Sequence, residues 1–231
     1  LATVPPPGDY DILHKIHVVT SQIASQDLTF NNNLERIKYD IFSSATGRLT
    51  TRKRSFPILS LDKKQRSLIT PKNDLFLELD LNGAEIRTLL AFSGAAQPLQ
   101  DIHEWNMRML PPWFSRVQAK EDFFAWLYNP RAKSESYEKH YNKKAHLEHY
   151  RGGTVTTPFG RVLPVDPRRA LNYLIQSTTS DIVMENAYKI MKRLHGHKSH
   201  LAFTMHDSIV LDFSKEDHNI VIELKEIFES N

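Results

Sequence analysis

Residues 201–213, LAFTMHDSIVLDF, place a His-Asp pair between two apolar segments. Each segment has the length and composition of a buried strand, so the stretch predicts an antiparallel hairpin with His206 and Asp207 at its tip. An ionised carboxylate next to buried strands is costly unless a partner stabilises its charge. Asp207 is therefore either a turn residue or part of a site whose ligand supplies that partner.

A second carboxylate follows another apolar segment. Residues 75–81, LFLELDL, predict a central strand that ends near Asp80. If the two strands are neighbours, Asp80 and Asp207 converge and can bind Mg²⁺, which takes one or two carboxylates plus substrate phosphates. Two such ions, about 3.5–4 Å apart, stabilise the attacking and leaving oxygens of a phosphoryl transfer. The alternative is that Asp207 is a turn residue and Asp80 a helix N-cap.

One predicted helix, residues 115–128, carries an unusual stripe of side chains. Arg116, Lys120, Phe124 and Tyr128 are spaced by four, so they follow one face of the helix. Two cations followed by two aromatic rings suit a nucleotide, because the cations can bind phosphates and the rings can pack on sugar and base. The alternative is that both rings lie in the core and both cations extend from it towards water.

Composition limits the class of protein. The 231 residues are 40% hydrophobic, enough for one large or two small domains, and there is no cysteine for disulfides or thiolate metal sites. The apolar runs are too short to span a bilayer, and the opening LATVPPPGDY suggests a piece of a longer protein. Basic clusters favour phosphate binding, with a solvated surface as the alternative: Arg52–Arg54 with Lys63, Lys64 and Arg66; Lys139 with Lys143 and Lys144; and Arg168 with Arg169.

The remaining pattern mixes helices and strands irregularly, which indicates an α+β fold. A loop or hairpin is expected at 152–164. Helices are predicted at residues 10–29, 34–44, 83–94, 101–110, 115–128, 134–150, 168–194 and 216–229.

Six motifs in order, across roughly residues 44–213, resemble those of family A DNA polymerases. R-x3-K-x3-F-x3-Y is similar to their nucleotide-binding fingers helix, DLNGAEIR at 80–87 to motif A, and HDS at 206–208 to motif C. The other three matches are TGRLTT at 46–51, DIH at 101–103, and PFGRVLP at 158–164 followed by Arg168, Asn172 and Gln176.

The resemblance implies a polymerase palm, an antiparallel sheet with helices, joined to helical fingers. The expected parts are a thumb base or N-terminal helices at 1–45, palm at 46–95, fingers at 96–160 and palm again at 161–231. Too few residues precede TGRL for a full thumb, and no 3′–5′ exonuclease domain is expected within this chain.

The resemblance also assigns roles at the reacting centre. Asp80 and Asp207 would bind two Mg²⁺ ions, or Mn²⁺, for attack of a primer 3′ oxygen on the α-phosphorus of a dNTP. Arg116 and Lys120 would bind the triphosphate with His103, and Lys120 is the general-acid candidate for pyrophosphate.

Further roles concern the sugar and the DNA. Glu85 would exclude a ribose 2′-OH, Phe124 would pack on the deoxyribose, and Tyr128 would stack near the templating position. Contacts to primer and template on the minor-groove side would come from Arg48, Arg168, Asn172, Gln176 and His206.

Three features depart from the family. Ser208 replaces a glutamate in motif C, and Asn129-Pro130 follows Tyr128 where glycine is usual. The interval from the fingers helix to PFGR is short, so either the fingers are trimmed or residues are missing.

Two other functions compete with a phage-type replicative DNA polymerase. One is a single-subunit RNA polymerase, against which Glu85 and Phe124 argue. The other is an inactive nucleic-acid-binding relative, against which both aspartates argue. The expected partners are primer-template DNA, dNTPs and a processivity or replisome protein, without a membrane. The expected location is the cytoplasm of a bacterial or phage-infected cell, with an organelle or the nucleus as alternatives.

Overall fold

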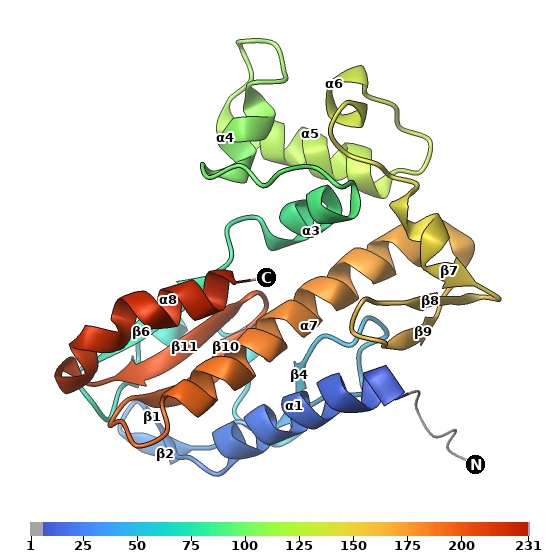
Figure 1. The fold of residues 1–231 in the computed structure, drawn as a ribbon. Helices are drawn as coiled ribbons and strands as arrows, with labels where there is room; N and C mark the ends of the chain where they lie inside the picture. The colour runs from blue at the N-terminus through green and yellow to red at the C-terminus, as the bar shows by residue number, and fades with distance from the viewer. Residues whose placement is uncertain (1–6, 231) are drawn as a thin grey trace. The chain divides into compact units, whose positions relative to one another are not determined.

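The computed structural model describes residues 7–230, which form two compact units (Figure 1). Unit 1 contains the chain up to Leu81, then Phe159–Arg161, and the chain from Ser180 onward. Unit 2 contains Asn82–Pro158 and Val162–Thr179. Residues 82–95, which the sequence assigned to the first palm segment, thus belong to the same compact unit as residues 96–158.

Unit 1 is built on a three-stranded antiparallel sheet in the order β10 (His200–Met205), β11 (Ser208–Phe213) and β6 (Leu75–Asp80). The predicted hairpin at 201–213 is confirmed. All six residues of β11 are buried, as expected of a central strand flanked on both sides. The strand predicted at 75–81 is confirmed as β6, but its predicted central position is wrong, because β6 lies at the edge of this sheet with only β11 beside it.

Helices complete the core of unit 1. Helix α1 (Pro7–Ala24) buries side chains spaced by four, three and four, which is the period of one helical face: Ile12, Ile16, Val19 and Ile23. The unit 1 part of α7 (Ala170–Arg193) joins this core, as do the 3₁₀ helix η4 (Lys215–Ile220) and α8 (Val221–Glu229).

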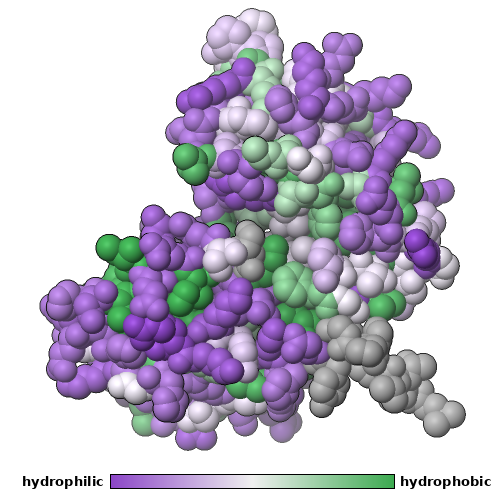
Figure 2. Space-filling view, viewed as in Figure 1, coloured by the Kyte–Doolittle hydropathy of each residue, from purple (hydrophilic) through white to green (hydrophobic). Residues whose placement is uncertain are grey.

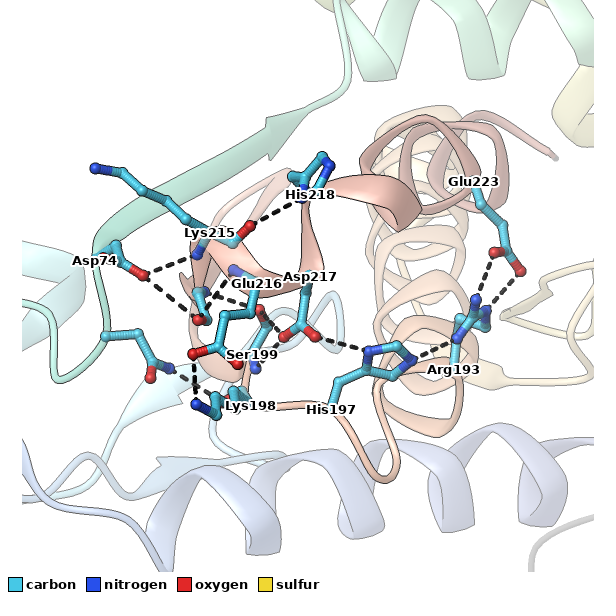
Figure 3. Close-up of polar contacts among 12 residues, drawn as sticks. Asp74, Arg193, His197, Lys198, Ser199, Lys215, Glu216, Asp217, His218 and Glu223 are labelled. Atoms are coloured by element: carbon cyan, nitrogen blue, oxygen red, sulfur yellow. Dashed lines mark hydrogen bonds and ion pairs between the residues drawn. The ribbon is translucent and has the colours of Figure 1, made fainter.

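A hydrogen-bond network ties the end of α7 to β10 and η4 (Figure 3). The Asp217 carboxylate accepts hydrogen bonds from the backbone and hydroxyl of Ser199, both 2.7 Å, and from His197 Nδ1 at 2.9 Å. His197 Nε2 lies 2.9 Å from Arg193 Nη1, and Arg193 binds Glu223. Because arginine can only donate, His197 accepts at Nε2 and carries its proton at Nδ1.

The predicted helix at 34–44 is wrong. Asn31 and Asn32 both have positive φ, 46° and 64°, the conformation of a two-residue hairpin turn. That turn pairs β1 (Leu28–Phe30) with β2 (Asn33–Glu35), and β5 (Ile69–Thr70) completes the small sheet. Further on, β3 (Tyr39–Asp40) pairs with β4 (Thr50–Thr51), before η1 (Ile58–Ser60) and α2 (Lys63–Arg66). The apolar periodicity was misleading, since Leu34 is 68% exposed.

Unit 2 is mainly helical. Its helices are α3 (Ala84–Phe92), α4 (Ile102–Met107), α5 (Arg116–Tyr128), α6 (Glu135–Glu138), η2 (Ala145–Glu148), η3 (Pro167–Arg169) and the first part of α7. A small antiparallel sheet joins β7 (Tyr150–Arg151), β8 (Thr154–Thr156) and β9 (Val162–Pro164). One core cluster combines aliphatic side chains with four aromatic ones, Phe123, Trp126, Tyr137 and Tyr141.

The predicted helix at 134–150 is largely wrong, because only α6 and η2 form there. The Asn142 side chain accepts a hydrogen bond from the Lys144 N–H at 2.9 Å, a local turn that competes with a helix. Lys143 Nζ donates instead to the carbonyl oxygens of Trp126, Asn129 and Ala132, at 2.8, 2.8 and 3.0 Å. These bonds fix the segment against the C-terminal end of α5.

The α+β class predicted from the sequence is confirmed. Within residues 7–230, none of the helices combines the length and apolar character needed to cross a membrane.

Candidate active site

The pairing of β6 with β11 brings two aspartates from distant parts of the sequence to one end of a sheet. Asp80 lies opposite Ser208, and the Leu81 N–H lies 3.4 Å from the carbonyl oxygen of Asp207. A two-residue turn joins β10 to β11, and His206 adopts φ of +49° in it. Left-handed backbone is uncommon outside glycine, although histidine is among the residues enriched there.

The negative charges near Asp80 disfavour its ionised form. Partial burial, then the charges of Asp207 and Glu78, raise the pKa of Asp80 to about 6. Glu78 is two residues before Asp80 on the same strand face, and its Oε1 accepts a hydrogen bond from Ser208 Oγ at 2.9 Å. Glu78 was not predicted as a site residue, although the alternation in LFLELD places it on the same strand face as Asp80.

This arrangement suits a divalent cation that takes few protein ligands. Repulsion among neighbouring carboxylates falls when a cation lies between them. Among the residues that the structure describes, no cluster of three or more His, Asp or Glu side chains could enclose a metal. Mg²⁺ fits this set, because it commonly takes one or two carboxylates and completes its shell with water and substrate phosphates.

A small pocket of about 320 Å³ lies within unit 1 and includes two residues predicted to contact DNA, Arg48 and His206. Its lining also includes Thr50, Ser180 and Thr204. Both predicted residues are solvent-exposed and carry groups able to donate hydrogen bonds to a nucleic acid strand.

A buried ion pair fixes the loop before Arg48. Arg161, from PFGR, binds Asp181, and the two side chains are 6% and 0% exposed. Arg161 also lies 3.5 Å from the carbonyl oxygen of Gly47. Gly47 has φ of +72°, and a Cβ there would lie 2.1 Å from Arg161 Nη1, so any other residue would strain the backbone and displace the Arg161 side chain. The TGRL and PFGR motifs therefore meet in one packed structure.

In unit 2, α5 begins and ends where its sequence dictates. Ser115 and Gln118 form a capping box at the start. Pro130 cannot continue the helix and holds Asn129 in extended backbone, so α5 ends at Tyr128.

Three of the four residues of the stripe predicted on α5 lie outside the core, and the fourth, Phe124, packs against it. The buried face consists of Ala119, Phe123, Trp126 and Leu127. By contrast, Arg116 and Lys120 are exposed, Phe124 is partly buried, and Tyr128 is 39% exposed. Tyr128 therefore does not belong to the core, contrary to the alternative interpretation of this helix.

A series of contacts joins the stripe to the other predicted nucleotide-binding residues. The Phe124 and Tyr128 rings stack, with centroids 5.9 Å apart, and the His103 ring lies 6.4 Å from Phe124. His103 is buried, and burial followed by the charge of Lys120 lowers its pKa. The Tyr128 hydroxyl donates a hydrogen bond to the Glu85 carboxylate.

Arg116 has a partner that the sequence did not indicate. Its guanidinium binds the Asp101 carboxylate through two N–H groups, at 3.1 and 2.6 Å. Asp101 also caps α4 by accepting from the His103 and Glu104 N–H groups. The Arg116 hydrogen bond, helped by those caps, lowers the pKa of Asp101 despite partial burial.

The last three predicted residues lie along η3 and the first part of α7. Arg168 is exposed, whereas Asn172 and Gln176 are partly buried. Arg168 and Asn172 line a large groove in unit 2, together with Tyr128. Asn172 Oδ1 is buried and has no hydrogen-bond partner among the described residues.

Comparison with known proteins agrees with this architecture. No family model matches the chain. The DNA polymerase of Mycobacterium phage D29 is 40% identical over 84 residues, 34% of this chain and 13% of the relative. The DNA polymerase of Mycobacterium phage L5 is 28% identical over 179 residues, 63% of this chain and 29% of the relative.

A solved structure covers nearly the whole chain. The POL domain of Pol1 from M. smegmatis, in complex with DNA primer-template and dNTP, superposes on 96% of this chain with a TM-score of 0.66 and 14% identity. The chain has the fold of a DNA polymerase POL domain. The likeness to DNA polymerases that the motifs predicted is thereby confirmed, and the chain spans 47% of that polymerase domain and under a third of either phage polymerase.

Proposed function

We propose that this chain is the catalytic part of a template-directed DNA polymerase that adds dNTPs to a primer 3′-OH. The observation that carries the proposal is the strand pairing that places Asp80 and Asp207 at one end of the β6–β11 pair. The polymerase fold and the two phage relatives support it. In this proposal, unit 1 acts as palm and unit 2 as fingers.

Asp80 and Asp207 would hold two Mg²⁺ ions in the working enzyme. The bound ions would neutralise charge on the attacking and leaving oxygens. The protein's own contribution is placement, since Asp80 at the end of β6 and Asp207 in the turn between β10 and β11 lie at one end of the sheet. Ser208 contributes by holding Glu78 through the 2.9 Å hydrogen bond.

Arg116 and Lys120 would bind the dNTP phosphates, and His103 would assist. The Asp101 carboxylate occupies Arg116 in this structure, so a triphosphate would share or replace that partner. The ion pair is partly exposed, and such pairs contribute about 0–1 kcal/mol, which makes the exchange inexpensive. Lys120, exposed and cationic, is the residue proposed to donate a proton to pyrophosphate.

Sugar selection is assigned to Glu85 and Phe124. The Tyr128 hydroxyl binds the Glu85 carboxylate and so restricts its rotamers. A fixed carboxylate excludes a ribose 2′-OH better than a mobile one, because it cannot move aside without losing a hydrogen bond. Phe124, stacked on Tyr128, would present a ring face to the deoxyribose.

Contacts with the primer and template are assigned to a set of polar residues from both units. Minor-groove acceptors are shared by correct base pairs, so such contacts test shape without reading sequence. The residues are Arg48, Arg168, Asn172, Gln176 and His206. The mycobacteriophage relatives make phage-type replication, in the cytoplasm of a bacterial host and with a replisome partner, the setting that we propose.

Primer extension tests this function directly. The chain is mixed with a primer-template, dNTPs and Mg²⁺, and extension is measured beside the variant Asp207→Asn. We expect the variant to lose extension by a factor of about 10³ or more, because one of two metal-holding charges is gone. DNA affinity should change less than about twofold, as anisotropy in metal-free buffer would report.

The matched control is Glu216→Gln, which removes an exposed carboxylate of unit 1 that pairs with Lys198. It should extend primers like the parent chain. Equal extension by the parent and Asp207→Asn would refute the metal assignment, and no extension by either would refute the function for this chain.

Glu85→Ala tests the sugar-selecting role. We expect ribonucleotide incorporation, relative to deoxyribonucleotide, to rise at least about tenfold, equivalent to about 1.4 kcal/mol. Tyr128→Phe, which removes only the hydroxyl that holds Glu85, should give a smaller rise in the same direction. Unchanged discrimination in Glu85→Ala would count against the assignment.

A further inference from the structure

The C-terminal end of α5 lacks the commonest device for ending a helix. A helix leaves its last carbonyl oxygens without intrahelical partners, and a residue in left-handed backbone, usually glycine, often turns the following N–H groups towards them. No glycine follows Tyr128. Instead Asn129 is extended, at φ −96° and ψ 108°, and Pro130 has no N–H to offer. The last turn of α5 contains no basic residue either, so these carbonyl oxygens depend on water or on a donor from another segment.

Lys143 is such a donor. Its Nζ atom donates to the carbonyl oxygens of Trp126 and Asn129, both at 2.8 Å, and to that of Ala132, at 3.0 Å. Every N–H of the ammonium group therefore has an acceptor. The charge also lies at the negative end of the α5 dipole and 4.8 Å from the centre of the Trp126 ring. Lys143 thus closes α5 from a segment that follows α6.

A neighbouring lysine shows that this arrangement is not required by the surface. The surface of unit 2 around α6 and the end of α5 is mainly hydrophilic (Figures 1 and 2). Lys133, next to Ala132 in the loop after α5, is exposed, and its side chain makes no hydrogen bond or ion pair among residues 7–230. Lys143, by contrast, is partly buried and directs all its donors to one helix end. Its contacts therefore concern the structure of that helix end and not solubility.

Tyr128 lies between two of the anchored carbonyl groups. Trp126 is two residues before it and Asn129 is the next residue, so Lys143 fixes the backbone on both sides. Because Tyr128 is 39% exposed, packing alone restrains its ring only in part. Its hydroxyl donates a hydrogen bond to the Glu85 carboxylate. The backbone sets the direction of a helical side chain, so the position of this hydroxyl depends on how firmly the end of α5 is held.

We propose that Lys143 is a positioning residue for sugar selection, which keeps the Tyr128 hydroxyl on the Glu85 carboxylate by holding the end of α5. The inference rests on the proposed polymerase function and deepens it, since a residue that touches no substrate group helps to distinguish deoxyribose from ribose. When the helix end is loose, Tyr128 no longer restricts the rotamers of Glu85. The carboxylate can then move aside for a ribose 2′-OH, and discrimination falls.

The test measures incorporation of a ribonucleotide relative to the matching deoxyribonucleotide, with primer-template and Mg²⁺. K143M keeps the length and apolar stem of the side chain and removes its donors and its charge. We expect relative ribonucleotide incorporation to rise about threefold, less than for Glu85→Ala because the effect is indirect. The kcat for the deoxyribonucleotide should stay within about twofold of the parent value, since both metal-holding aspartates remain.

A matched control and a second variant keep the result specific. K133M removes an exposed lysine from the loop next to Ala132 and should keep the parent ratio. Circular dichroism at the assay temperature shows whether each variant is folded. If K143M is unfolded there, K143Q replaces it, and because its amide keeps N–H donors without the charge the expected rise is about twofold.

A double-mutant cycle separates positioning from general stabilisation. Y128F removes the hydroxyl that Lys143 is proposed to position. In that background, K143M should add less than about 1.5-fold to relative ribonucleotide incorporation, because two residues that act through one contact are not additive.

Three outcomes would overturn the proposal. One is parent-like discrimination in a folded Lys143 variant, even if its melting temperature falls. Another is an equal rise with and without the Tyr128 hydroxyl, since Lys143 would then act by another route. The third is failure of the polymerase function itself, which is recognised separately because the parent chain then extends no primer with either sugar.

Discussion

Asp80 in unit 1 and Asp101 in unit 2 are both partly exposed carboxylates, and each begins one of the motifs found in the sequence. Their electrostatic surroundings, however, are opposite. Asp101 accepts hydrogen bonds from Arg116, Asn82 and two backbone N–H groups, which lower its pKa. Asp80 lies beside Asp207 and Glu78, and its pKa is raised to about 6. One carboxylate is satisfied by the protein itself, and the other is the one that we propose binds a cation.

This difference shows how to separate structural from functional charges in this fold. A structural carboxylate has its cation or N–H donors built into the chain, so its removal costs stability. A functional carboxylate is kept close to other negative charges by the strands around it. Its removal therefore reduces activity and relieves the electrostatic repulsion.

The largest effect on stability is expected at Asp181, the carboxylate most completely satisfied by a partner. Asp181→Asn removes the negative charge that the buried guanidinium of Arg161 binds in this ion pair. Breaking one side of a buried pair costs about 3–5 kcal/mol, so the free energy of unfolding should fall by that amount in urea titrations. A loss under about 1 kcal/mol would show that the pair does not fix this part of unit 1.

A smaller loss is expected at Asp101. Asp101→Ala removes both the cap of α4 and the partner of Arg116, which together are worth about 1–2 kcal/mol in unfolding free energy. Asp101→Asn keeps an acceptor for the cap and should lose less than half of that. If the two variants lose the same amount in denaturation experiments, the cap contributes nothing.

The smallest effect is expected at Asp80 and depends on pH. Its pKa of about 6 in the folded state is above the ordinary value of an aspartate carboxyl, so the folded state binds the proton more tightly. Stability from this group is therefore complete below about pH 4 and is lost as the pH rises through about 6. In metal-free buffer, the melting temperature of the parent chain relative to Asp80→Asn should fall by about 2 °C across that window, since exposure screens the repulsion.

A difference that is flat with pH, or one that grows as the pH rises, would contradict that prediction. Glu216→Gln serves as the control, because this exposed carboxylate has a lysine partner. The melting temperature of the parent chain relative to Glu216→Gln should not fall across the same window.

The elements that the sequence predicted correctly are those in which the local residue pattern and the tertiary contacts favour the same structure. The hairpin around His206 and Asp207 combines apolar strands with a polar turn, and α5 has both its capping box and a proline stop. The helix predicted at residues 34–44 was wrong because the turn at Asn31 and Asn32, and not the apolar spacing, determines the local structure. That turn had a recognisable signal, since asparagine tolerates positive φ.

Other features could not be found in the sequence because they depend on contacts between distant residues. The Arg161–Asp181 pair, the bond from Ser208 to Glu78 and the three carbonyl contacts of Lys143 join separate segments. The Arg116–Asp101 pair is similar: both residues were noted, but no spacing rule links position 101 to position 116. Such contacts can be recognised only when the folded structure is known.

The central claim is that Asp80 and Asp207 form one binding site for divalent cations. Titration of the chain with Mn²⁺ at pH 8, followed by electron paramagnetic resonance of the free ion, tests it without DNA or nucleotide. The account predicts that Asp80→Asn and Asp207→Asn each weaken Mn²⁺ binding at least about tenfold, whereas Glu216→Gln does not. Parent-like Mn²⁺ binding by both aspartate variants would contradict it.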